Sequence, residues 1–212
     1  MPGRTPKEAF RNFIEPIQDA LACLGSAKIT TSANGTGNGP VSQNAKHSWV
    51  INTSRGMQRG DLALWASMEY RFVDRRRTDP DIAVSDRWKI RTASYIYTIR
   101  HQGHDASEWH WHPESSLNVR FPHMHLQSAV LTPDGVLSPR THLPGGKTAF
   151  EQVIRILITD FGWPPQVDDW EERLTLHEGT FRLYSSWSAG PPPIIESPYR
   201  RSVSGSPPFP EI

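Results

Sequence analysis

Apolar side chains recur at every second position through residues 62–70, and this pattern restricts the fold more than any other feature of the chain. The apolar residues occupy one parity, while Ser67, Glu69 and Arg71 occupy the other. Because successive side chains of a strand point to opposite faces of a sheet, the alternation predicts a strand with one buried face. Residues 87–100 are rich in β-branched and aromatic side chains and predict a second long strand. Shorter strands are expected at 107–112 and 118–131.

Helical patterns precede and follow these strands. Thr5 and Glu8 form a capping box for an N-terminal helix that ends at Gly25. Thr148 and Glu151 form a second capping box, and a third helix is expected after residue 168. The layout predicts an α+β fold, with an antiparallel sheet of about four to six strands packed by an N-terminal helix and two C-terminal helices.

Composition divides the chain into four segments. The N-terminal helix occupies residues 1–30, and a flexible linker or loop with no large apolar residue except Val41 occupies 31–47. The α+β domain spans 48–187, and a Pro/Ser-rich tail expected to be disordered spans 188–212. Helices on one face of the sheet would leave the other face available for function.

Charge and cysteine content narrow the class of protein. The net charge of +1 excludes a strong overall basic field, so any nucleic-acid binding must come from local patches. A single cysteine, Cys23, excludes an internal disulfide and a cysteine-cluster zinc site. No apolar run approaches the roughly 18 residues that a membrane span requires. We therefore expect a soluble, cytoplasmic protein with no membrane partner.

Histidines are gathered in one part of the chain. Seven of the nine lie between residues 101 and 142, and four form two His-x-His pairs, His110/His112 and His123/His125. Residues i and i+2 of a strand project to the same side, so each pair presents two imidazoles on one face. If the two strands pair as a hairpin, the four imidazoles are a usable ligand set for Zn²⁺ or another divalent transition metal.

Acid–base chemistry without a cofactor is a second interpretation of the same histidines. RNA cleavage needs a base, an acid and a cation near the phosphate, and His123, His125 and Arg120 can supply all three. Lys147, just before a helix start, can contact a phosphate where backbone amides already favour anions. A third interpretation is that the histidines are ordinary, hydrogen-bonded residues of an aromatic-rich sheet.

A basic strand face is the candidate binding surface. Arg87, Lys89 and Arg91 alternate along one predicted strand, and Tyr95 continues their parity. Such a face can hold phosphates and stack bases, which makes these four residues candidate RNA ligands. An ordinary solvated strand face and a non-catalytic module that binds RNA or a protein remain alternatives.

Two segments resemble toxins of the TumE type from bacterial toxin–antitoxin pairs: VRFPHMH, at 119–125, and TAFEQVIRILITDF, at 148–161. The resemblance covers parts of residues 69–161. It implies an endoribonuclease in which His123 and His125 cleave RNA with help from Arg120. It also implies a cognate antitoxin as partner, and a homodimer is left open. The chain departs from that pattern in its additional pair His110/His112 and in a longer insert before the second segment.

Overall fold

The computed structural model describes residues 1–42, 44–51, 56–114, 119–126, 143–184 and 186–187. Three α-helices lie in this part of the chain: α1 (Pro6–Ala22), α2 (Phe150–Thr159) and α3 (Trp170–Tyr184). Two short 3-10 turns, Arg75–Arg77 and Val84–Asp86, lie between the two longest strands. None of the described helices is long and apolar enough to cross a membrane. The expected tail, 188–212, lies outside the described residues.

One sheet contains all the described strands, in the order β1-β2-β4-β5-β6-β7-β8, with β3 beside β4 and β9 beside β5. All pairs are antiparallel except β5 with β9. The strands are β1 (Ile29–Thr31), β2 (His47–Ile51), β3 (Met57–Arg59), β4 (Leu62–Asp74), β5 (Trp88–His101), β6 (His104–Trp111), β7 (His123–Leu126), β8 (Leu143–Pro144) and β9 (Ser186–Trp187). The predicted α+β fold with an antiparallel sheet is thus confirmed.

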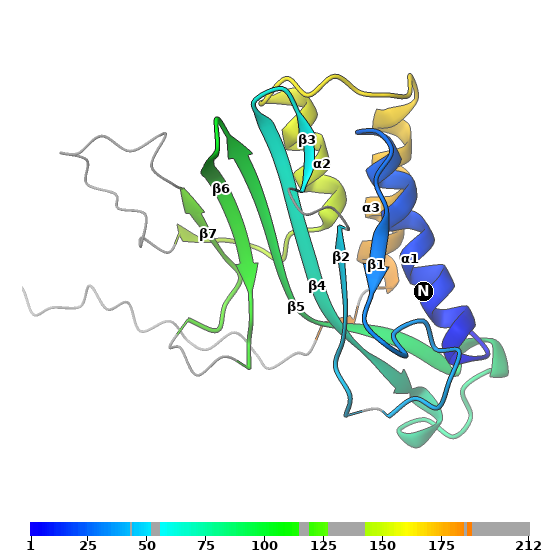
Figure 1. Cartoon of the computed structure of the whole chain (residues 1–212). Coiled ribbons are helices and arrows are strands. Elements are labelled where there is room, and N and C mark those ends of the chain that lie inside the picture. The colour runs from blue at the N-terminus through cyan, green and yellow to red at the C-terminus, as the bar shows by residue number, and fades with distance from the viewer. Residues whose placement is uncertain (43, 52–55, 115–118, 127–142, 185, 188–212) are drawn as a thin grey trace, which may run out of the picture.

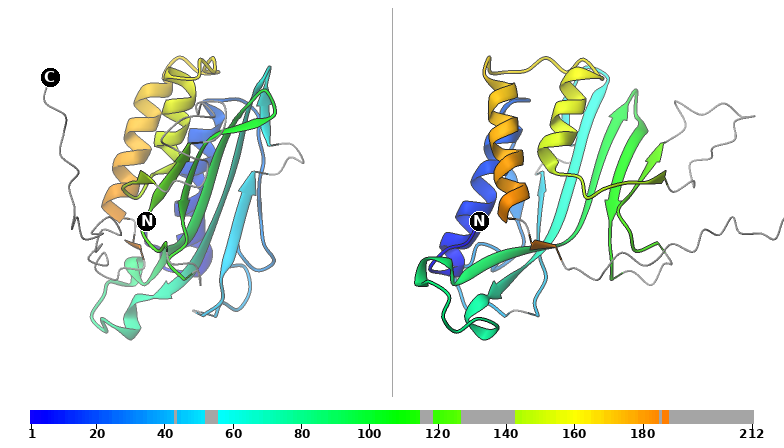
Figure 2. Two further views of the ribbon diagram at one scale, coloured as in Figure 1. Left: turned by 90° about the vertical axis from the view of Figure 1, so that its left-hand side faces the viewer. Right: turned by 180° about the vertical axis from the view of Figure 1, so that it is seen from behind.

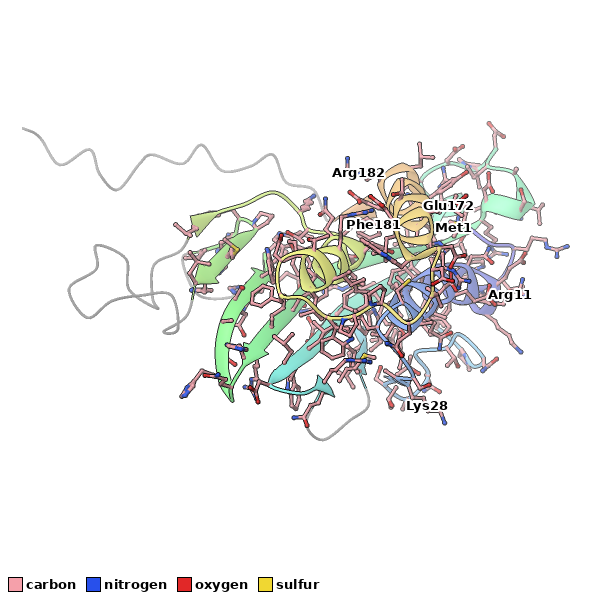
Figure 3. The ribbon with its side chains drawn as sticks, turned by 90° about the horizontal axis from the view of Figure 1, so that it is seen from above. Met1, Arg11, Lys28, Glu172, Phe181 and Arg182 are labelled. Atoms are coloured by element: carbon pink, nitrogen blue, oxygen red, sulfur yellow. The ribbon has the colours of Figure 1, made fainter. Side chains whose placement is uncertain are left out.

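All three helices pack against the same face of the sheet, which we call the covered face (Figures 1 and 2). The view from above in Figure 3 shows the helices side by side on that face. Most of the core lies between the layer of helices and the sheet. Large aromatic side chains dominate this core, as they do in many domains. The fully buried aromatics are Trp49, Tyr70, Phe72, Tyr95, Tyr97, Phe150 and Trp163.

The other face of the sheet, which we call the open face, carries the polar residues of the alternation. Ser67, Glu69 and Arg71 of β4 lie on it, as the sequence predicts, while Met68 and Tyr70 between them are buried. No helix in the described part of the chain covers this face (Figure 2).

A β-bulge in β5 changes which residues reach each face. Thr92 is opposite Tyr70 and Ser94 is opposite Glu69, so Ala93 is the additional residue. Lys89 and the other odd-numbered residues before the bulge therefore lie on the open face, whereas odd-numbered residues after it lie on the covered face.

Helix starts follow the sequence in one case and depart from it in the other. The Thr5 side chain accepts a hydrogen bond from the Glu8 backbone N–H at 3.1 Å, so the Thr5 half of the predicted box is confirmed. The Glu8 carboxylate accepts from the backbone N–H of Arg4 instead of that of Thr5. At α2 the predicted box of Thr148 and Glu151 is wrong. The side chain of Gln152 accepts from the backbone N–H of Ala149 at 3.0 Å instead, and Glu151 is buried.

Candidate functional site

Strands β6 and β7 pair so that the two His-x-His segments meet. His110 is directly opposite His123, and Glu108 is directly opposite His125. These residues share the open face, because Trp109 between them is opposite Met124 on the covered face. β7 is shorter than predicted and begins only at His123, directly after Phe121 and Pro122.

The imidazoles of His110, His112, His123 and His125, which we call the histidine cluster, lie in contact with one another. Ring centroids are 5.0 Å apart for His110–His125 and His123–His125, 5.4 Å for His110–His123 and His112–His123, and 5.8 Å for His110–His112. The structure therefore brings together all four histidines that the sequence singled out.

Burial differs within the cluster. His123 is only 3% exposed, and its Nδ1 lies 2.9 Å from the carbonyl oxygen of Phe121. In the neutral ring this contact places the proton on Nδ1 and the lone pair on Nε2. His125 is half-buried and is the member of the two that lies nearer to solvent.

Glu108 is a functional candidate that the sequence reasoning missed. Its two carboxylate oxygens lie 2.6 Å from His110 Nε2 and 2.8 Å from the Thr98 hydroxyl that donates to it. This short contact pairs the His110 ring with the Glu108 carboxylate. Burial raises the pKa of Glu108, but the contacts with His110 and Thr98 outweigh burial and hold that pKa below its usual value.

The signal for Glu108 was present in the sequence. Glu108, His110 and His112 share one parity in the segment EWHWH, so the carboxylate had to lie on the same strand face as the imidazoles.

Three members of the cluster have the geometry of a metal site. One ring nitrogen from each of His110, His112 and His123 lies within 4.8 Å of the others. His112 Nδ1 is buried and makes no hydrogen bond to any residue that the structure describes. Imidazole nitrogen is a common ligand of zinc, copper, iron and nickel.

An open hollow of about 360 Å³ adjoins the cluster on the open face. His112, Lys46 and Glu114 are among the residues that line it. Glu114 is bound by two cations, with Lys46 Nζ at 3.1 Å and Arg71 Nη2 at 2.9 Å. The hollow therefore has polar, charged walls directly beside an imidazole.

Arg71, Lys89 and Arg91, which we call the cationic strip, follow β4 and β5 on the same open face. Arg87 is bound to Asp74 at 2.8 Å. Burial lowers the pKa of Lys89, and the neighbouring charges of Arg75 and Arg91 lower it further. The predicted shared face agrees with the placement of Lys89 and Arg91. Arg87 precedes β5 with a helical backbone conformation, so the strand alternation does not extend to it.

Tyr95 does not join the strip, and its predicted role in base stacking is wrong. It is 1% exposed on the covered face, stacks on Tyr97 at 4.7 Å and accepts a hydrogen bond from the Thr148 backbone N–H. The extra residue Ala93 in the bulge shifts the parity, so an aromatic that continues the pattern on paper faces the helices instead.

Lys147 also lies away from the cluster. Its Nζ is 5.2 Å from the ring centroid of Trp111, whose buried side chain belongs to the covered face. Desolvation lowers the pKa of Lys147. The predicted convergence of Lys147 with His123 and His125 on one phosphate is therefore wrong, because the sheet separates them.

Arg120 is exposed and precedes β7 by three residues. Among the described residues, no hydrogen bond or ion pair joins its guanidinium to the histidine cluster. His101 and His104 flank the two-residue turn of the β5–β6 hairpin, in which Gln102 and Gly103 have positive φ angles of 52° and 80°. These two exposed histidines are separate from the cluster.

Comparison of the chain with protein-family models, curated proteins and solved structures finds no match in any of the three. The function must therefore be inferred from the geometry of the site itself.

Proposed function

We propose that this protein is an endoribonuclease whose active site is the histidine cluster. The observation that carries the proposal is the meeting of two His-x-His segments on the open face, where His123 and His125 have ring centroids 5.0 Å apart. Two imidazoles at this separation can act as acid and base in one reaction.

The reaction is transfer of the phosphate to the neighbouring ribose oxygen. A base removes the 2′-hydroxyl proton, the oxygen attacks phosphorus, and the bond from phosphorus to the 5′ oxygen breaks. An acid protonates the departing oxygen, which leaves a 2′,3′-cyclic phosphate and a 5′-hydroxyl. His125 is the better placed of the pair to reach substrate, because His123 is nearly sealed from solvent.

The cationic strip supports a polyanionic substrate. Arg91 and Lys89 are on the same face as the cluster, and a strand advances roughly 3.3 Å per residue. The five positions from Arg91 to Ile96, the cross-strand neighbour of His110, therefore span about 16 Å, the reach of a few nucleotides. Arg120 is a further candidate for phosphate binding, and a cognate antitoxin that covers the open face is the partner that fits this proposal.

A cleavage assay with the purified full chain tests the proposal. We expect a single-stranded RNA oligonucleotide to be cut and the DNA of the same sequence to stay intact, because DNA lacks the attacking hydroxyl. His125→Ala should slow cleavage by about 100-fold or more, since one general acid or base contributes roughly 10²–10⁴-fold. His104→Ala removes an exposed histidine outside the cluster and should cleave at the wild-type rate. Equal rates for all three proteins would contradict the proposal.

Substitution of the strip separates catalysis from binding. The double variant Lys89→Ala/Arg91→Ala should weaken RNA binding. In a plot of the logarithm of affinity against the logarithm of salt concentration, the magnitude of the slope should fall by roughly one to two. The control variant Lys7→Ala/Arg11→Ala removes the same charge from α1 and should leave the RNA affinity and its salt dependence unchanged. Tight, strip-dependent binding with no cleavage by the wild type would favour a non-catalytic RNA-binding module instead.

A further inference from the structure

We infer that His110, His112 and His123 together bind one divalent transition-metal ion, with Zn²⁺ as the best fit. The inference rests on the proposed function but changes the role of His123 from acid or base to metal ligand. It is measured without RNA, because it concerns the ion alone. It rests on four observations: the spacing of the three nitrogens, the unsatisfied ring nitrogen of His112, the tautomer of His123 and the carboxylate behind His110.

Spacing is the first observation. Ligand nitrogens at about 2.0–2.1 Å from a tetrahedral zinc ion are roughly 3.3 Å apart. The three imidazole nitrogens lie within 4.8 Å of one another, so modest ring rotations bring them into that range. The paired strands β6 and β7 hold the backbone of two ligands in direct register, which limits the conformational entropy lost on binding.

Hydrogen bonding is the second observation. Buried polar atoms in proteins are almost always paired, because an unpaired one costs about 1–3 kcal/mol. His112 Nδ1 is buried in the cluster without a hydrogen bond to any described residue. His110 directs its Nε2 at the Glu108 carboxylate, which leaves its other ring nitrogen to face an ion. A bound cation with its coordinated water satisfies such a site.

The surroundings of the ligands supply the remaining two observations. Metal-binding histidines usually direct their second ring nitrogen at a carbonyl or a carboxylate, which orients the ring. His123 places Nδ1 against the carbonyl of Phe121, and His110 lies against Glu108, which Thr98 orients in turn. A histidine that is 3% exposed is also better suited to holding an ion than to reaching a substrate.

Three protein ligands leave a coordination position for water or substrate, as in catalytic zinc sites. The ion would then polarise a phosphate oxygen. In this arrangement His123 is a ligand, and His125 remains available for proton transfer.

Calorimetric titration of the chelator-treated full chain with Zn²⁺ tests the inference. We expect one ion per chain, and His112→Ala should weaken binding by more than about 100-fold, with Glu108→Gln weakening it by roughly 10–100-fold. His104→Ala is the matched control on the same strand and should bind like the wild type. His112→Gln, which retains a polar side chain, repeats the measurement if the alanine variant does not fold.

Three results would overturn the inference: no stoichiometric binding by the wild type, equal affinity for the His104 and His112 variants, or a loss in His125→Ala as large as that in His112→Ala. The last result would make His125 a ligand. Zinc binding without RNA cleavage supports the metal site and contradicts only the proposed substrate. RNA cleavage that persists in chelator, together with no zinc binding, supports the proposed function and contradicts the metal site.

Discussion

Phe150→Ala should lower the free energy of unfolding by about 3–5 kcal/mol, the range for removing a buried phenylalanine. Phe150 is the first residue of α2 and is 1% exposed. Its ring meets Trp49 of β2 at 5.5 Å and Tyr97 of β5 at 5.4 Å, so it joins the helix to two strands of the sheet. The lost stability has two parts: the transfer free energy of the removed ring, and the cost of the cavity that remains because the helices and the sheet cannot fully close around it.

Denaturant unfolding followed by tryptophan fluorescence and circular dichroism measures this change. Phe150→Leu keeps most of the apolar volume and should cost roughly 1–2 kcal/mol. Leu176→Ala, at a position on α3 that is 65% exposed, should change stability by less than about 0.5 kcal/mol. A Phe150→Ala loss no larger than that of Leu176→Ala would contradict the packing described for the core.

Glu151→Gln should stabilise the protein by about 2–3 kcal/mol at pH 8. Glu151 is 1% exposed between the helices and the sheet, and burial, together with the charge of Glu178, raises its pKa to about 7. It borders a cavity of about 30 Å³, room for about one water molecule, which His177 also lines. The nitrogen Nε2 of His177 lies 2.6 Å from Asp19, so this imidazole has a partner other than Glu151.

The raised pKa of Glu151 decides how the unfolding free energy changes with pH. The folded state binds the proton of Glu151 more tightly than the unfolded state, so its contribution is fully present below about pH 4.5 and is lost as pH rises to about 7. Glutamine keeps the neutral form at every pH. The difference in unfolding free energy between variant and wild type should therefore grow between pH 5 and pH 8, and denaturant unfolding at several pH values measures it. A difference that is independent of pH would mean that Glu151 is charged in the folded protein.

Several features of the fold follow from local sequence rules. Alternation at residues 62–71 predicts β4 and its faces, because the side-chain period of a strand is two. Thr5 predicts the start of α1, because its hydroxyl satisfies a backbone N–H that the helix cannot. The shared face of the two imidazoles in each His-x-His pair also follows from a local rule, because residues i and i+2 of a strand point to the same side. By contrast, β1, β2 and β3 were not identified individually, because strands of three to five residues carry too few positions for a periodicity to appear.

The sequence by itself determined that each His-x-His pair presents its rings on one side of its own strand. Only the tertiary structure decided that β6 and β7 pair in the register that places His110 opposite His123, since register depends on contacts between segments far apart in the chain. One bulged residue, Ala93, turned Tyr95 from the open face to the core, and the thickness of the sheet separated Lys147 from the histidines. Local periodicity fixes directions within one element, whereas a site depends on the relative placement of several elements, which packing of the whole core decides.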